Sequence, residues 1–135
     1  MHLINLNDPD LLLGLWRGMI KAYPSNNLEL WGWCVLVGKV LQAHSKTVAL
    51  ATLYIPSTFG CASWNPAEMI NSEYKAWKFQ IYLLGLGLAL FWHILAKEYW
   101  NNYCKYVSDI QILQWWIINP NDLQKKHKLL CKFAK

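Results

Sequence analysis

The chain has 135 residues, of which 55% are hydrophobic and 16% are charged, with a formal net charge of +5. A chain this apolar buries enough surface to offset the entropy lost on ordering, which excludes intrinsic disorder. The charged fraction is below the roughly 25% of an ordinary soluble domain. Nine Trp, seven Tyr and four Phe gather at the ends of apolar runs as well as inside them, as is typical of membrane proteins.

The first expected element is a short apolar helix over residues 8–23. Asp8 lies in a helix-start signal, and Pro24 follows the last apolar residues. Arg17 and Lys21 are four residues apart and share one face, which suits a membrane surface or the end of a small bundle. The residues before this helix contain no basic region ahead of an apolar stretch, so we expect no secretory signal peptide.

Residues 30–59 form a possible first membrane element. Residues 47–67 are uncharged and long enough to cross a bilayer of roughly 30 Å, although polar residues dilute them. Pro56 should kink or end a helix there. We therefore expect a spanning or re-entrant element within residues 31–59. One polar stripe of a helix is marked by residues at spacings of three and four: Lys39, Gln42 and Lys46.

The clearest apolar segment runs from Phe79 to Ala96 without a formal charge. Trp77 and Trp100 flank it, and at about 1.5 Å rise per residue a helix would separate them by roughly 35 Å. Aromatic and basic flanks of this kind mark the two interfaces of a membrane. We predict a transmembrane helix over residues 77–100. The alternative is a buried helix in the core of a soluble all-α domain.

Two amphipathic helices are expected after this segment, over residues 105–118 and 121–134. The first has apolar residues at three- and four-residue intervals, and the second opposes an apolar face to a lysine cluster. The cluster suits the anionic headgroups of a membrane surface, with a solvated tail as the alternative. Nucleic acid is an unlikely partner because no basic face with interleaved aromatic residues is present. The lysines expected at the membrane surface are Lys125, Lys126, Lys128 and Lys132.

The distribution of Lys and Arg favours two spans over one. Two spans leave four basic residues in the N-terminal part, two in the connection and seven in the C-terminal part. The positive-inside rule then places both termini in the cytoplasm. With a single span, the numbers of Lys and Arg on its two sides are nearly equal, so the rule predicts no orientation.

One face of the predicted membrane helix carries Gly85, Ala89 and His93 at spacings of four. Small residues let a neighbouring helix approach closely, so we predict a helix-packing interface here. His93 is interpreted as a structural or interfacial residue. The alternatives are an interhelical hydrogen bond, and haem ligation or proton transfer with His44 as its possible partner. The expected partner or interface anchors are Trp77, Trp100, Trp115 and Trp116.

No motif predicts catalysis. The acidic residues are scattered, and the chain contains no nucleophile elbow, no zinc-protease motif and no phosphate-binding loop. The four cysteines form no C-x-x-C pair, so we interpret them as reduced, mostly buried groups. We therefore expect no catalytic, cofactor-binding or metal site.

The leading hypothesis is a single-domain, all-α integral membrane protein over residues 1–135, with a probable two-helix transmembrane hairpin and flanking amphipathic helices. It would act as a non-catalytic structural or assembly subunit of a larger membrane complex. Its partners would be membrane lipids and other membrane-protein subunits, or copies of itself. The alternatives are a self-assembling membrane pore-type protein, a soluble all-α protein-binding module that buries residues 79–96, and a haem-binding electron carrier.

Overall fold

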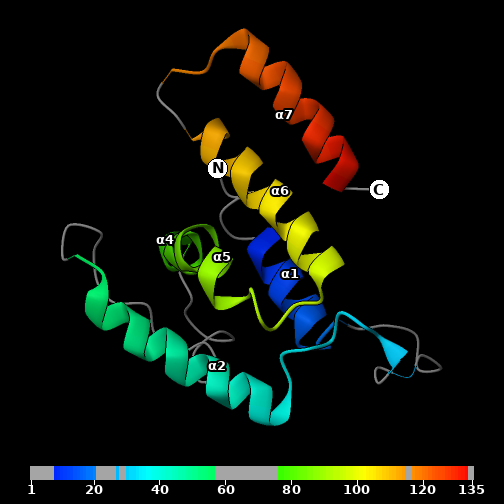
Figure 1. Cartoon of the computed structure of the whole chain (residues 1–135), viewed down its shortest axis with the longest axis vertical. Coiled ribbons are helices and arrows are strands. Elements are labelled where there is room, and N and C mark those ends of the chain that lie inside the picture. Colours follow the sequence, from blue (N-terminus) through cyan, green and yellow to red (C-terminus); the bar gives the residue numbers. More distant parts are fainter. Residues whose placement is uncertain (1–7, 21–26, 28–29, 57–75, 115–116, 134–135) are drawn as a thin grey trace.

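The computed structural model describes residues 8–20, 27, 30–56, 76–114 and 117–133. These residues form helices joined by turns and contain no strand, which confirms the all-α fold class. Figure 1 shows the helices in chain order: α1 (Asp8–Trp16), α2 (Gly38–Ala51), η3 (Thr52–Tyr54), α4 (Ala76–Phe79), η5 (Gln80–Leu86), α5 (Gly87–Leu90), α6 (Lys97–Leu113) and α7 (Pro120–Phe133). The element η3 is a 3-10 helix and η5 is a π-helix.

The first helix ends at Trp16, although the sequence predicts a helix over residues 8–23. Asp8 and Asp10 lie in its first turn, where negative charge stabilises a helix N-terminus. Gly18 has a φ of 63°, a left-handed conformation that glycine adopts without strain and that commonly ends a helix. This glycine accounts for the early end of α1.

The second helix, α2, lies inside the predicted element 30–59. It has 14 residues, which at 1.5 Å per residue gives a length of about 21 Å. One side of α2 buries His44, Ser45 and Val48, and the opposite side is exposed. Figure 1 shows α2 along one edge of the molecule, with α7 along the opposite edge. The helix therefore contributes only one face to the core.

The segment predicted to cross a membrane, residues 77–100, is not one continuous helix. The elements α4, η5 and α5 follow one another from Ala76 to Leu90, and the chain then turns over residues 91–96 before α6 begins. Among the described residues, no helix combines the length and the apolar character that crossing a membrane requires. The fold therefore gives no support to the predicted transmembrane hairpin.

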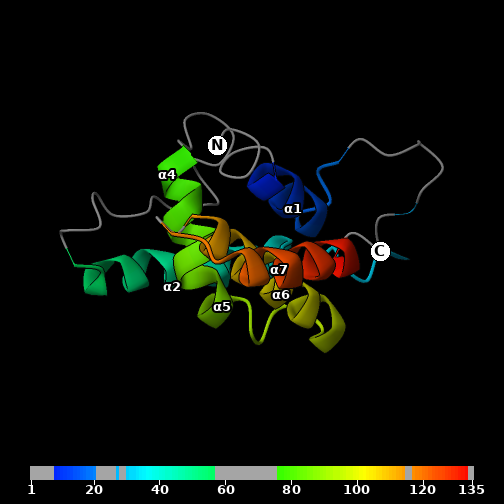
Figure 2. The ribbon, with the colours of Figure 1, turned by 90° about the horizontal axis from the view of Figure 1, so that it is seen from above.

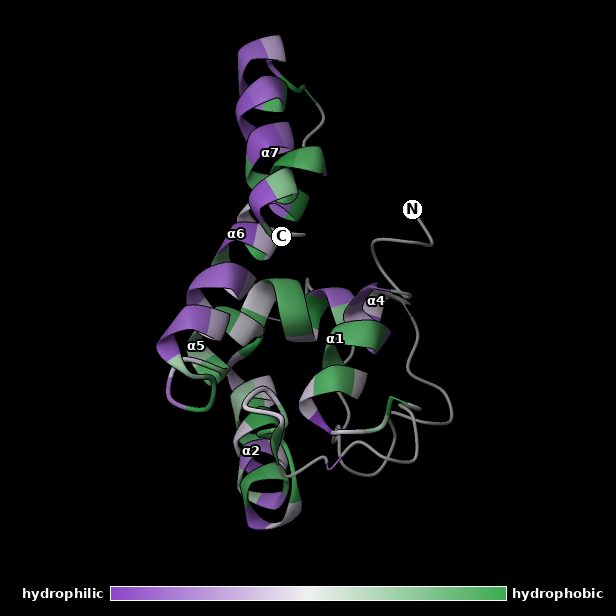
Figure 3. Ribbon diagram, turned by 90° about the vertical axis from the view of Figure 1, so that its right-hand side faces the viewer, coloured by the Kyte–Doolittle hydropathy of each residue, from purple (hydrophilic) through white to green (hydrophobic). Residues whose placement is uncertain are grey.

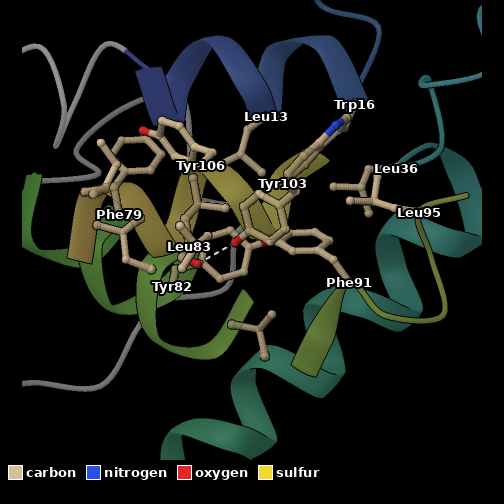
Figure 4. Close-up of a cluster of buried hydrophobic side chains, with 14 residues drawn as sticks. Leu13, Trp16, Leu36, Phe79, Tyr82, Leu83, Phe91, Leu95, Tyr103 and Tyr106 are labelled. Carbon is tan, nitrogen blue, oxygen red and sulfur yellow. Dashed lines mark hydrogen bonds between the residues drawn. The ribbon is translucent and has the colours of Figure 1, made fainter. Parts of the chain in front are cut away.

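This break follows from the position of Phe91 at the centre of an aromatic cluster (Figure 4). The centroid of its ring lies 4.8 Å from those of Trp16 and His44, and 5.7 Å from those of Tyr82 and Tyr103. These rings come from α1, α2, η5 and α6, so the turn after α5 brings one side chain into contact with four elements. The buried hydrophobic core comprises Leu13, Trp16, Leu36, Val48, Phe79, Tyr82, Leu83, Leu84, Phe91, Leu95, Tyr103, Tyr106, Val107 and Ile110.

The helices α6 and α7 form an antiparallel pair, seen side by side in Figures 1 and 2. Asn102 Nδ2 donates to the carbonyl of Phe133 over 3.3 Å, and Lys126 Nζ donates to Ser108 Oγ over 2.7 Å. The helix α6 starts earlier than the expected residue 105, whereas α7 differs by one residue at each end from the expected range. Figure 3 shows α7 as mostly hydrophilic and α1 as mostly hydrophobic.

Candidate binding surfaces

The outward side of α2 carries an apolar row that continues into η3, which we call the outer stripe. Its five residues are spaced by three and four, as in a coiled-coil heptad, and all of them are exposed. The side chain of Thr47 donates to the carbonyl of Ala43 over 3.1 Å, so the hydroxyl is satisfied within the helix. Exposed fractions reach 61% for Leu50 and 86% for Tyr54. The outer stripe consists of Val40, Ala43, Thr47, Leu50 and Tyr54.

The adjoining face of α2 is buried and is held in place by His44. Its Nε2 lies 2.6 Å from the hydroxyl of Tyr82 in η5, and its ring stacks on Phe91. Burial lowers the pKa of His44 to about 4, so the imidazole is neutral near pH 7. The buried face of α2 is thus fixed against the core, and the outer stripe faces away from it.

The predicted packing face of residues 85, 89 and 93 is exposed. A Cβ added at Gly85 would meet no heavy atom within 4 Å, and Ala89 and His93 are both exposed. His93 lies beyond the end of α5, so the three residues do not share one helix. The close approach occurs at Gly87 instead, where an added Cβ would overlap the hydroxyl of Tyr103. The contact of η5 and α5 with α6 therefore depends on a different glycine.

The tryptophans predicted as anchors have different surroundings. Trp77 is 37% exposed, with the ammonium of Lys78 5.6 Å from its ring centroid. Trp100 is half-buried: its indole nitrogen donates to the carbonyl of Leu88 over 3.3 Å, and its ring meets that of Trp92 at 4.2 Å. Trp100 thus connects α6 to α5. The other two predicted anchors, Trp115 and Trp116, lie outside the described residues.

The four predicted surface lysines of α7 divide into two groups. Lys125, Lys128 and Lys132 are exposed along the outer side of the helix. Lys126 turns inward, with its Nζ 3.5 Å from Oδ1 of the fully buried Asp109. Burial raises the pKa of the Asp109 carboxyl, and the charge of Lys126 acts in the opposite direction. Lys126 therefore belongs to the contact between α6 and α7, and three lysines remain for an outside partner.

A cavity of about 340 Å³ opens between α1, α6, the end of α7 and the segment before α2. The indole N–H of Trp33 at its wall is buried without an acceptor in the described structure. We call this space the aromatic cavity, because five of its lining side chains are rings. Its lining residues are Leu12, Leu15, Trp16, Trp33, Tyr99, Asn102, Tyr103 and Phe133.

The described residues contain no group of three or more His, Cys, Asp or Glu side chains that could hold a metal ion. Cys34 and Cys104 are half-buried free thiols, and Cys131 is an exposed one. The fourth cysteine, Cys61, lies outside the described residues. The surfaces that the fold offers are thus apolar, aromatic and basic.

Sequence reasoning named His44 only as a possible partner of His93, and it did not identify Gly87 or Trp33 as site residues. The partner of His44 is 38 residues away in the chain, so no local pattern reveals it. The sequence did contain one indication that Lys126 faces inward: it is four residues before the apolar Leu130, so the two share a helix face.

The chain matches no protein-family model, no curated protein and no solved structure.

Proposed function

We propose that this chain is a small non-catalytic subunit that joins a larger assembly by docking a helix of another protein on the outer stripe. The observation that supports the proposal is the exposure of Val40, Leu50 and Tyr54 at heptad spacing on a helix whose other side is packed on the core. An apolar seam of this kind fits an amphipathic helix laid along it. In this role the chain would act by binding alone, through a surface whose position is fixed by the core.

The charge on α2 indicates which kind of partner helix would bind there. Lys39 and Lys46 flank the outer stripe seven residues apart, and α2 contains no acidic residue. A partner helix with acidic side chains beside its apolar seam would pair with both lysines. A second copy of this chain would bring the same positive charges together and be repelled. We therefore propose an acidic amphipathic helix from a different protein.

Two synthetic amphipathic peptides test this proposal. They share one apolar heptad pattern and differ only in the flanking residues, which are Glu in one peptide and Lys in the other. We expect the full chain to bind the Glu peptide more tightly, by a margin that shrinks as salt is added. Fluorescence anisotropy of the labelled peptides measures both affinities.

Two sets of variants locate the binding. Leu50→Gln with Tyr54→Gln should abolish it, whereas Ile117→Gln, at an equally exposed position outside α2, should not. Lys39→Glu with Lys46→Glu should reverse the preference between the peptides. Lys125→Glu with Lys128→Glu is the matched control, because it changes the net charge equally on α7. An unchanged preference in the α2 charge reversal would refute the docking proposal.

An integral membrane subunit is the second candidate. The observation that favours it is the exposure of large apolar side chains in separate parts of the described chain, such as Leu30 at 82% and Ile117 at 86%. In this form the subunit would insert as a hairpin with both termini in the cytoplasm, and residues 79–96 would exchange the core for lipid. Basic side chains on α7 would then contact anionic headgroups.

Alkaline carbonate extraction of membranes from cells expressing the chain separates the two candidates. Release into the supernatant supports the docking subunit, and retention in the pellet supports the integral one. Sedimentation velocity adds the remaining alternative: a homo-oligomer lost in the Leu50 and Tyr54 double variant would mean that a second copy occupies the outer stripe, as a pore-type protein requires.

A further inference from the structure

We infer that α7 is a detachable helix, which leaves α6 to lie on the surface of an anionic lipid bilayer and is held back by the ion pair between Lys126 and Asp109. None of the residues involved belongs to the outer stripe, so failure of either proposal leaves the other standing. This membrane contact also differs from that of the integral subunit, because residues 79–96 stay in the core.

The side chains of α7 divide into an apolar face and a basic face, each with spacings of three and four residues. A helix of this kind lies in the interface of a membrane, with its apolar face toward the acyl chains and its lysines on anionic headgroups. Nucleic acid would use the lysines and leave the apolar face without a role. The apolar face consists of Leu123, Leu130 and Phe133, with Lys126 among them. The basic face consists of the exposed Lys125, Lys128 and Lys132.

The helix α7 is incompletely seated on α6. It lies at the edge of the molecule (Figure 1), and none of its residues is fully buried. The ring of Phe133 lies 5.1 Å from that of Tyr106 at one end of α7, whereas Leu123 near the other end is 47% exposed. A groove of about 720 Å³ opens beside Leu113, Leu123 and Leu130. The acyl region of a bilayer would cover the apolar surface that α6 leaves open.

The ion pair between Lys126 and Asp109 opposes this transfer. The Nζ of Lys126 lies 3.5 Å from Oδ1 of Asp109, and it donates to Ser108 Oγ over 2.7 Å. Asp109 is fully buried, and neither of its carboxylate oxygens has a hydrogen bond in the described structure. Separating such a pair is unfavourable while the carboxylate stays buried. Departure of α7 also lets water reach the carboxylate, so a bilayer that binds the free helix can shift the equilibrium.

Vesicles of phosphatidylcholine, with and without phosphatidylglycerol, test the membrane partner. We expect the full chain to co-sediment with the anionic vesicles, and much less with phosphatidylcholine alone, by a margin that shrinks as salt is added. Lys128→Gln should weaken the binding roughly fivefold, because it removes one lysine from the headgroup layer. Leu123→Gln should weaken it roughly tenfold, because it places a polar group toward the acyl chains.

A change on α6 tests the ion pair without altering α7. Asp109→Asn removes the buried partner of Lys126, so it should favour the undocked helix and tighten vesicle binding by about fivefold or more. Glu98→Gln is the matched control, because it makes the same change of charge at an exposed position of the same helix. It should alter the affinity by less than about twofold. Circular dichroism checks that each variant folds.

A second comparison covers an Asp109→Asn chain that does not fold. Lys126→Gln should tighten vesicle binding, whereas Lys128→Gln weakens it, although each variant removes one lysine from α7. Equal weakening in these two variants would mean that α7 binds lipid without leaving α6, and the inference would be wrong.

Three further results would overturn the inference. The first is a wild-type chain that does not bind the anionic vesicles, and the second is an Asp109→Asn chain that binds no more tightly than the Glu98→Gln chain. The third is equally tight binding of a single-stranded oligonucleotide with no loss in Leu123→Gln, which would assign the basic face to nucleic acid. Alkaline carbonate should release the vesicle-bound chain, since retention would mean that residues 79–96 have inserted.

Discussion

His44 and Tyr82 are both buried, and they form a 2.6 Å hydrogen bond that joins α2 to the π-helix η5. The imidazole also stacks on Phe91, so one side chain connects the outlying helix to the centre of the core. The orientation of the outer stripe depends on this connection, since it fixes which side of α2 faces inward.

The stability of the protein should fall as the pH drops below about 6.5. Burial lowers the pKa of His44 to about 4 in the folded state, against roughly 6.5 in the unfolded chain. The unfolded state then binds the extra proton first, so stability is complete above pH 6.5 and is lost progressively toward pH 4, by about 2–3 kcal/mol. Urea unfolding followed by circular dichroism at several pH values measures the slope.

The variant His44→Phe isolates this effect. It should flatten the pH dependence between 6.5 and 4, whereas His93→Phe, at an exposed histidine, should preserve it. Burial raises the pKa of Asp109, which contributes the opposite slope at the acidic end in every variant. A His44→Phe chain with the wild-type slope would assign the pH dependence to other groups.

Gly87→Ala should destabilise the fold by about 1–3 kcal/mol, because the added methyl group must displace the Tyr103 side chain. That displacement also strains the hydrogen bond from the Tyr103 hydroxyl to the carbonyl of Leu83. Gly85→Ala is the control, since its methyl group enters open space and should be neutral or slightly stabilising. Denaturant midpoints of the two variants should therefore move apart.

Lys126→Gln should lower the free energy of unfolding by about 3 kcal/mol at neutral pH, because it leaves the buried Asp109 carboxylate without its compensating charge. The cost should shrink in acid, where the carboxyl is protonated in the folded state. Lys128→Gln, at an exposed position on the same helix, should change stability by less than about 0.5 kcal/mol. Equal losses in the two variants at pH 7 would contradict the inward role of Lys126.

Phe91→Ala should lower the free energy of unfolding by about 3–5 kcal/mol, as expected for removing an aromatic ring from a core. The ring is fully buried and contacts rings from four elements. Trp92→Ala removes a larger ring that is 51% exposed and should cost much less. Thermal unfolding of both variants tests whether the apolar segment is organised around Phe91.

The all-α class could be predicted from the sequence because helical periodicity is a local property. Whether residues 79–96 lie in a protein core or in a membrane could not be predicted, because their composition suits both. Nothing in the local sequence marks the turn after Leu90, because no proline occurs there and the turn depends on rings supplied by α1, α2 and α6. The bond between His44 and Tyr82 likewise requires knowledge of the fold.

The apolar and basic faces of α7 were predictable, because both repeat within the helix itself. The contact between Lys126 and Asp109 was not predictable, since the direction of one lysine side chain depends on the partner helix that carries Asp109. The aromatic cavity had no signal at all, because its walls come from segments that only the fold brings together.

The π-helical geometry of η5 changes the directions in which the side chains of the following residues point around the helix axis. A π-helix closes its hydrogen bonds over five residues instead of four, so each turn takes up additional chain. A helical wheel drawn at a constant 100° per residue therefore goes out of step within Gln80–Leu86. A constant wheel also does not apply to residues 85, 89 and 93, because α5 ends at Leu90, before His93. In the turn that follows α5, Phe91 is buried and Trp92 is exposed.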